Sequence, residues 1–387
     1  MNIVFFTHPS FQSHQSMPRF AKMLGDGMLK RGHLIAFWSP KARFNKLPVP
    51  HSLKKWMGYI DQYIVFPLEV RMRIGRCTAD TLFVFTDHAL GPWIPLAANK
   101  PHAIHCHDFL AQRSALGEIE HNKTGWSGKK YQSFIFNGYS KGRYFISVSE
   151  KTRGDLAHFL PSKPQRSEMV YNGLNQSFTP IPTDLARRTL SNTTELDLSS
   201  GFILHVGGNQ WYKNRKGVIE IYTAWRSSTL LGSLPLLLVG YKPDAALQEV
   251  YEASPFKHDI HLLTDLSDEL VRMAYAGASV FVFPSLAEGF GWPIAEAMAS
   301  GCAVITTDAA PMTEVAGEAA VLIPLRTQEN ASGWAKEGAA AIDLILQETE
   351  EEKNVRIAKG LENANRFDAE AALNRIEEIY RGIVDNS

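Results

Sequence analysis

Cysteine is scarce in this chain. Cys77, Cys106 and Cys302 are the three cysteines among 387 residues, they lie far apart, and no Cys-x-x-Cys pair occurs. A disulfide framework needs more cysteines at closer spacing. We therefore expect three reduced, buried thiols in a cytoplasmic protein.

Long apolar runs and an overall charge are also missing. No apolar stretch approaches the roughly 20 residues that span a bilayer, so no membrane-spanning helix is expected. Met1 leads directly into a strand pattern, which predicts no signal peptide. The net charge is zero, yet residues 1–176 carry +12 and residues 177–387 carry −12. This asymmetry indicates that the first half meets an anionic partner.

The positive charge is concentrated between Lys41 and Arg76, where eight bases stand against two acids and several aromatic residues are interspersed. One interpretation is peripheral contact with an anionic membrane face, or with a lipid-linked acceptor. The alternatives are attraction between the two halves of the chain, or a solvated basic face. No nucleic acid is expected among the partners.

Strand and helix patterns alternate along the whole chain, which predicts parallel sheets covered on both faces. The expected strands are Ile3–Phe6, Leu34–Trp38, Leu82–Phe85, Ala103–Cys106, Tyr144–Val148, Glu168–Tyr171, Phe202–Val206, Leu236–Val239, Ile260–Leu263, Val280–Phe283, Ala303–Thr306 and Ala320–Ile323. The fold class is therefore α/β, with two doubly wound, Rossmann-like units in series.

The length of the chain favours two domains. A segment near Asn175–Ser200 is rich in Pro, Thr and Ser and lacks a strand pattern, which indicates a boundary. We expect one domain over residues 1–180 and a second over residues 181–365. An amphipathic helix within residues 366–387 is expected to cross back to the first domain.

The segment Phe283–Gly301 carries the most informative motif, FPSLAEGFGWPIAEAMASG. A buried strand ends before Pro284, and Glu288 and the Gly289-Phe290-Gly291 turn follow. A helix then begins near Pro293, with Glu296 in its first turn. Carboxylates and amide groups beyond the end of a parallel strand suit a hydroxyl-rich, anionic ligand. The alternative is a helix N-terminus with acids placed favourably for its dipole.

A second motif lies at Val206–Gly217, VGGNQWYKNRKG. A buried strand ends in two glycines, bases follow, and a helix starts near Gly217. Glycines allow close backbone approach and cations neutralise phosphate, so the motif is typical of a phosphate site. The alternative is a solvated basic turn.

Two further segments carry polar groups after predicted strands of the first half. His105-Cys106-His107-Asp108 invites a zinc interpretation, but no second pair of ligands is evident, and a buried core histidine is the other alternative. The loop Thr7–Ser16 contains Ser13, whose hydroxyl could donate to a phosphate, although simple capping by Ser16 explains the pattern as well.

The segment Leu266–Pro324 resembles the donor-binding region of retaining GT-B glycosyltransferases of glycosyltransferase family 4. Glu288 and Glu296 match the Glu-x7-Glu pair of that family. The resemblance runs from Ile3 to the tail helix, is strongest over residues 202–324 and is weak over residues 40–100. It implies a donor pocket between two domains, with the donor mainly on the second and the acceptor on the first.

The resemblance also implies roles for individual residues. The catalytic set would be His107 beside the donor sugar, Lys213 on the leaving diphosphate and Glu288 on the sugar hydroxyls. The donor-binding set would comprise Ser13, Asn209, Lys213, Arg215, Leu266, Glu288, Gly289, Phe290, Gly291 and Glu296. Two departures stand out: Gly208 occupies the position of a customary diphosphate arginine, and the first loop lacks the usual Gly-Gly pair.

The implied function is transfer of a hexosyl unit from a UDP-, GDP- or ADP-sugar to a glycan or lipid-linked acceptor, with retention of configuration. GT-B enzymes lack a metal-binding Asp-x-Asp motif and none occurs here, so no metal or cofactor is expected. The alternatives are a nucleotide-sugar epimerase of the same fold and a catalytically silent binding subunit. The expected location is the cytoplasm, with the inner face of the membrane as a site of contact.

Overall fold

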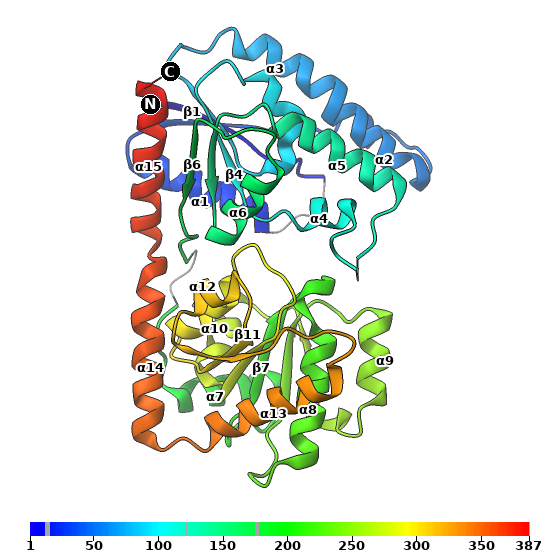
Figure 1. The fold of residues 1–387 in the computed structure, drawn as a ribbon, viewed down its shortest axis with the longest axis vertical. Helices are drawn as coiled ribbons and strands as arrows, with labels where there is room; N and C mark the ends of the chain where they lie inside the picture. Colours follow the sequence, from blue (N-terminus) through cyan, green and yellow to red (C-terminus); the bar gives the residue numbers. More distant parts are fainter. Residues whose placement is uncertain (12–15, 121, 175–177, 387) are drawn as a thin grey trace. The chain divides into compact units, whose positions relative to one another are not determined.

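The chain forms two compact units in a computed structural model that describes residues 1–11, 16–120, 122–174 and 178–386. The first unit comprises Met1–Asn175 together with Ala369–Ser387, and the second comprises Gln176–Asp368. Each unit is a six-stranded parallel sheet with helices packed against it (Figure 1). This architecture confirms the predicted α/β class with two doubly wound sheets.

The first sheet has the strand order β2-β1-β3-β4-β5-β6. Its strands are β1 (Asn2–Phe6), β2 (Leu34–Trp38), β3 (Leu82–Phe85), β4 (His102–Cys106), β5 (Tyr144–Ser147) and β6 (Arg166–Met169). The helices of this unit are α1 (Ser16–Lys30), η1 (Phe44–Lys46), α2 (His51–Ile60), η2 (Asp61–Val65), α3 (Phe66–Ile74), η3 (His88–Leu96), α4 (Leu110–Leu116), α5 (Trp126–Tyr139), α6 (Glu150–Phe159) and α15 (Ala369–Asp385). The direction of winding reverses between β1 and β3, which makes that position a topological switch point.

The second sheet has the order β12-β11-β10-β7-β8-β9, which is the order of dinucleotide-binding sheets. Its strands are β7 (Ile203–Gly207), β8 (Leu236–Gly240), β9 (Ile260–Thr264), β10 (Val280–Phe283), β11 (Val304–Thr307) and β12 (Ala320–Ile323). Its helices are α7 (Thr183–Thr194), η4 (Trp211–Lys213), α8 (Arg215–Ser228), α9 (Ala245–Ala253), η5 (Lys257–Asp259), α10 (Asp268–Gly277), α11 (Trp292–Ala299), α12 (Met312–Ala316), α13 (Ala331–Leu346), α14 (Glu350–Ala364) and η6 (Asn365–Phe367). The switch point here lies between β7 and β10.

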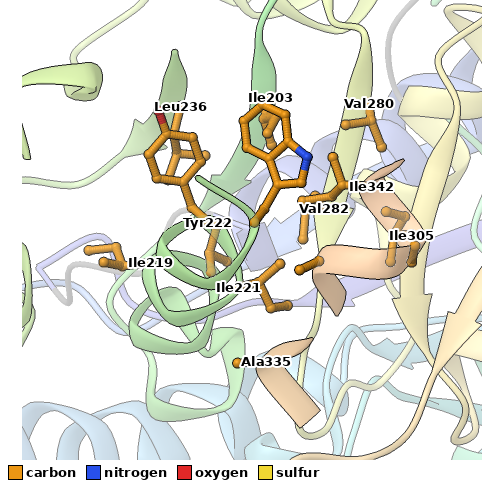
Figure 2. Close-up of a cluster of buried hydrophobic side chains, with 14 of the residues drawn as sticks. Ile203, Ile219, Ile221, Tyr222, Leu236, Val280, Val282, Ile305, Ala335 and Ile342 are labelled. Atoms are coloured by element: carbon orange, nitrogen blue, oxygen red, sulfur yellow. The ribbon is translucent and has the colours of Figure 1, made fainter. Parts of the chain in front are cut away.

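The core of the second unit fills the space between its sheet and helices α8 and α13. Figure 2 shows Ile203, Val280 and Val282 from the strands meeting Tyr222 from α8 and Ile342 from α13. The equivalent core of the first unit is rich in aromatic rings, among them Phe6, Phe66, Phe83, Phe85 and Trp93. Burial of these apolar side chains against each sheet fixes the strand ends from which the loops emerge.

All twelve predicted strands are present, and β6 begins two residues earlier than expected. The boundary segment differs more, because helix α7 lies within it and packs against α10. Ala186 and Leu190, four residues apart, bury the apolar stripe of this helix. The abundance of Thr and Ser concealed that stripe in the sequence.

Helix α15 belongs to the first unit, although it follows the whole of the second along the chain. Tyr380 of this helix is fully buried, and its hydroxyl lies 2.7 Å from Nε2 of the buried His105 on β4. Two ion pairs also join this helix to the rest of the first unit, from Arg31 to Glu370 (2.7 Å) and from Arg375 to Glu168 (3.1 Å). In the described part of the chain, no helix is both long enough and apolar enough to cross a bilayer.

Three buried histidines predict a loss of stability in weak acid. Burial lowers the pKa of His102 to about 4 and those of His105 and His205 to about 3, because a low-dielectric interior disfavours the charged ring. The unfolded chain takes up protons near pH 6.5, so stability is complete above that pH and is lost as the pH falls toward 4. Each histidine steepens the pH dependence of the unfolding free energy by at most about 1.4 kcal/mol per pH unit.

Urea unfolding of the protein between pH 7.5 and pH 4.5 measures this effect. We expect His102→Gln to flatten the pH dependence for the first unit while leaving that of the second unchanged. Equal unfolding midpoints at pH 7 and pH 5 would contradict the neutral state of these rings.

Candidate functional site

Two loops meet at the switch point of the second unit. Residues 208–214 follow β7 and residues 284–291 follow β10, and these strands are neighbours in the sheet. The loops leave the carboxyl ends of their strands toward opposite halves of the sheet, and ligands bind at such positions in open α/β sheets. The structure thus brings together the two sequence motifs that lie about 70 residues apart.

Hydrogen bonds tie the two loops to each other. The Leu286 amide donates to the Tyr212 carbonyl at 2.7 Å, and Nδ2 of Asn214 donates to the Pro284 carbonyl at 2.9 Å. Asn214 has a positive φ of 51° and also caps helix α8, because its Oδ1 accepts from the Gly217 amide at 3.2 Å. One buried amide side chain therefore sets the start of α8 and the spacing between the loops.

Lys213 and Glu288 form an ion pair across the two loops. The Lys213 Nζ donates to Oε1 of Glu288 at 2.7 Å, and the Ser285 hydroxyl donates to the same oxygen at 2.9 Å. The side chains are 16% and 7% exposed, respectively. The ammonium group also lies 5.0 Å from the centroid of the Phe283 ring. A cation and a carboxylate are thus held in a defined place where screening by water is weak.

Glu296 lies on helix α11 beyond the Gly289–Gly291 turn. It is the fifth residue of the helix, so it occupies the second turn and not the first as predicted. Its Oε2 accepts a hydrogen bond from the Tyr275 hydroxyl at 2.9 Å. Burial, together with the Glu296 carboxylate, raises the pKa of Tyr275, which keeps that hydroxyl protonated as the donor. The carboxylate is therefore oriented by a neighbouring helix.

The turn itself uses its glycines unequally. Gly291 has a φ of 104°, a backbone conformation that favours glycine. Gly289 is not among the described residues that have a positive φ. The Phe290 side chain is buried and packs edge-on against Phe367 at 5.4 Å. Phe290 therefore anchors the turn through its ring, and its backbone is the part that the turn presents.

Asn209 and Arg215 serve the loop internally. The guanidinium of Arg215 is buried and donates to Oδ1 of Asn209 and, at 2.9 Å, to the Tyr241 carbonyl. Asn209 in turn donates to the Lys242 carbonyl at 2.6 Å. These bonds fasten the loop after β7 to the end of β8. The guanidinium of Arg215 is thus engaged inside the loop. It does not stand in for the diphosphate arginine that the resemblance expects at the position of Gly208.

Two residues of the predicted donor-binding set remain, Leu266 and Ser13. Leu266 is half-buried and lies between β9 and helix α10, at the same carboxyl edge of the sheet as the two loops. Ser13 lies outside the described residues.

His107 follows β4 in the first unit. Its Nε2 lies 2.9 Å from the Thr86 carbonyl, so this nitrogen carries the proton, and its own carbonyl accepts from the Thr152 hydroxyl at 3.3 Å. Burial lowers the pKa of His107, which keeps the ring neutral at neutral pH. Asp108 accepts from the Leu110 amide at 3.0 Å and so supports the loop. Among the described residues, no three His, Cys, Asp or Glu side chains converge as metal ligands would.

The switch point of the first unit holds a cluster that the sequence motifs did not reveal. His8 follows β1, and its Nε2 lies 2.9 Å from Oδ2 of Asp87, which follows β3. The other carboxylate oxygen of Asp87 lies 3.1 Å from Nδ1 of His88. Burial alone would raise the pKa of Asp87, but its bonds to His8 and His88 outweigh burial and hold the pKa well below its usual range.

A cavity of about 300 Å³ adjoins this cluster. His8 and Asp87 line it on one side, and tyrosines from α2, η2 and α5 line it on the other: Tyr59, Tyr63 and Tyr131. The hydroxyls of Tyr63 and Tyr131 lie 2.7 Å apart, and the rings of Tyr59 and Tyr131 stack. A cavity with aromatic faces and a few fixed polar groups is the usual form of a small-molecule site. The sequence signal was a polar residue two positions after the end of each of two buried strands.

Two family sequence models match the chain. Residues 17–178 match the family described as Glycosyltransferase Family 4, and residues 201–342 match the family described as Glycosyl transferases group 1. The first match falls mainly on the first unit and the second falls within the second unit. Between them the two matches cover most of the chain.

Two curated relatives act in O-antigen assembly according to their names. O-antigen chain mannosyltransferase B of Escherichia coli is 29% identical over 185 residues, which are 47% of this chain and 46% of that protein. O-antigen chain mannosyltransferase RfbU of Salmonella typhimurium is 25% identical over 198 residues, which are 50% of this chain and 51% of that protein. The chain thus spans about half the length of these relatives.

Solved structures share the fold over the whole chain. A sucrose-phosphate synthase from Thermosynechococcus elongatus has a TM-score of 0.75 at 16% identity and covers 100% of both chains. Anabaena HepE, solved in complex with UDP and glucose, has a TM-score of 0.70 at 15% identity and covers 98% of both chains. These likenesses agree with the two sheets described above. The chain belongs to the GT-B glycosyltransferases, within the group described as Glycosyltransferase Family 4 and Glycosyl transferases group 1.

Proposed function

We propose that this glycosyltransferase moves a hexosyl unit from a nucleotide-diphosphate sugar to a glycan or lipid-linked acceptor, with retention of configuration and without a metal ion. The ion pair between Lys213 and Glu288 at the second switch point carries the proposal. It places one cation and one carboxylate, both mostly buried, at the edge where α/β sheets receive nucleotides.

The two members of the pair have complementary tasks. The Lys213 ammonium stabilises the negative charge that develops on the departing diphosphate. Glu288 and the amides of Gly289–Gly291 hold hydroxyls of the transferred sugar, and Glu296 accepts from the ribose hydroxyls. Because Glu288 already accepts bonds from Lys213 and Ser285, it acts as a hydrogen-bond acceptor and not as a nucleophile.

The transfer step then needs no protein base. The bond between the anomeric carbon and the diphosphate oxygen breaks, and the acceptor oxygen attacks the same face of the sugar. The acceptor hydroxyl passes its proton to the departing diphosphate oxygen, so charge and atoms balance. The neutral ring of His107 supports a role in stabilising positive charge at the sugar and argues against a role as acid.

The relatives favour a particular acceptor class. The two curated relatives described above are named as O-antigen chain mannosyltransferases, which supports a mannosyl or related hexosyl donor and a growing polysaccharide as acceptor. HepE binds UDP and glucose in its solved complex, which supports a nucleotide-sugar donor for this chain as well.

We further assign the acceptor sugar to the cavity of the first unit. Its tyrosine rings offer apolar faces for a sugar ring, and the paired His8 and Asp87 offer fixed hydrogen-bonding atoms for its hydroxyls. Asp87 orients His8, so the histidine presents one defined tautomer to the acceptor.

Two rival functions make different products. An epimerase of this fold would release an epimeric sugar without an acceptor, and a silent binding subunit would neither transfer nor hydrolyse the donor. Product analysis with and without acceptor distinguishes the three.

Lys213→Ala and Glu288→Gln are each expected to lower kcat by about a hundredfold to a thousandfold. Lys213→Ala removes the cation that stabilises the departing diphosphate, and Glu288→Gln removes the carboxylate that holds this cation in place. Lys216→Ala is the matched control, since Lys216 is exposed and pairs with Glu220 on the same helix. Circular dichroism checks that the variants fold. Undiminished transfer by either site variant would refute the role of the pair.

A thermal-shift panel of UDP-, GDP- and ADP-sugars identifies the donor. A ligand at about 100 times its Kd adds about 2.7 kcal/mol to the stability of the unit that binds it. We expect one base to raise the melting temperature of the native protein and to raise that of Lys213→Ala much less. A panel that shifts nothing would contradict nucleotide binding by this site.

His8→Ala is expected to raise the KM for the acceptor about tenfold or more while leaving slow hydrolysis of the donor in water unchanged. The control is Ser133→Ala, which alters an exposed hydroxyl on the same helix as Tyr131. Equal losses of acceptor transfer and donor hydrolysis would place His8 in donor chemistry instead.

A further inference from the structure

A long helical rod in the first unit leaves an apolar row exposed. Helices α2, η2 and α3 follow one another without interruption from His51 to Ile74. Large apolar side chains are exposed along the rod. Leu53 and Trp56 lie three residues apart in α2, Leu68 and Met72 lie four residues apart in α3, and Ile64 lies between these pairs in η2. Trp56 and Met72 are 60% and 65% exposed. Apolar residues repeated at this spacing form one face of a helix, which normally is buried.

Helix α5 extends the same surface. Figure 1 shows α5 running alongside the rod, and the contacts of Tyr59 and Tyr63 with Tyr131 join them. Trp126 at the start of α5 is 76% exposed and Phe134 is 46% exposed. Phe134 lies 5.4 Å from Tyr63, so its exposed ring adjoins the rod.

The charges on this surface have one sign. Residues 41–76 and α5 together carry ten Lys and Arg but two acids, Asp61 and Glu69. Asp61 is buried and accepts from the backbone amides of Arg43, Phe44 and Asn45. Glu69 pairs with Arg43 and Arg73. Backbone amides thus hold Asp61 inside the first unit and arginines pair with Glu69, while cations such as Lys55, Arg71 and Lys130 are exposed.

We name the exposed residues of the rod and of α5 the basic-apolar surface: Leu53, Lys55, Trp56, Ile64, Leu68, Arg71, Met72, Trp126, Lys129, Lys130 and Phe134. We propose that the basic-apolar surface docks the first unit on an anionic lipid bilayer. Apolar and aromatic side chains enter the boundary between headgroups and acyl chains, and the surrounding cations pair with lipid phosphates. An acidic protein partner is the competing occupant, but lysine is depleted in protein interfaces, whereas this surface exposes Lys55, Lys129 and Lys130 beside its apolar row.

Docking on lipid goes beyond the proposed function, because it does not depend on which sugar is transferred or on whether transfer occurs. Its measurement is physical binding to lipid, so failure of the glycosyltransferase assay and failure of docking are distinguishable.

Vesicle flotation tests the proposal with the full chain. The vesicles contain either phosphatidylcholine alone or phosphatidylcholine with about one third phosphatidylglycerol. We expect flotation with the anionic vesicles alone, and a clear loss at 0.5 M salt because exposed charges are then screened. Flotation to the same extent with both compositions, or with neither, would overturn the proposal.

Matched variants locate the surface. Lys55→Glu with Arg71→Glu is expected to lower the partition coefficient at least about tenfold, as is Trp56→Gln with Met72→Gln. The controls change the same numbers of exposed side chains in the second unit: Lys336→Glu with Lys359→Glu, and Leu230→Gln with Leu344→Gln. Equal effects of the test and control pairs would overturn the assignment to this surface. Unfolding midpoints near that of the native protein, measured first, ensure that loss of binding is not loss of fold.

Discussion

The contact between Lys213 and Glu288 is the interaction on which the second unit's binding edge depends. An ammonium and a carboxylate this little exposed are expensive to bury separately, and together they neutralise each other. Their positions are set by elements that are far apart in the sequence, the ends of β7 and β10. Asn214 also fixes the spacing between the two loops, because its side chain donates a hydrogen bond to the Pro284 carbonyl. The ammonium and the carboxylate are consequently held in place before any ligand binds, and under the proposed function the diphosphate of the donor would meet a cation that is already positioned.

The switch point of the first sheet carries different side chains from the switch point of the second. The first also carries a buried carboxylate, but the partners of Asp87 are imidazoles instead of an ammonium. An ammonium group is a compact cation with several donors, which suits a site for phosphate. A histidine can donate or accept according to its tautomer, which suits neutral hydroxyls. Both sheets thus have a switch point, although their strand orders differ, and the two units place different side chains there.

The sequence predicted the framework well because most of the parallel strands are short apolar runs. An exception is β6 (Arg166–Met169), which is polar and half-buried and was predicted two residues too late. Through the family resemblance it also placed Lys213 and Glu288 in one donor pocket. The structure brings the two loops that carry them together, and the role of each residue stays a prediction. It missed the link between His8 and Asp87, since 79 residues separate them and only the strand order makes β1 and β3 neighbours. It could not show that Arg215 and Asn209 bond to each other, because an exposed base and a buried one look alike in a sequence.

Helix α15 has a consequence for the order in which the chain folds. The second unit is a continuous stretch of chain, whereas the first is completed by a helix that follows it. During synthesis the second unit can close on itself while β4 still lacks the cover that Tyr380 provides. The first unit therefore waits for a helix that is made after the whole second unit, and a chaperone that binds apolar surfaces would meet its uncovered sheet during that interval.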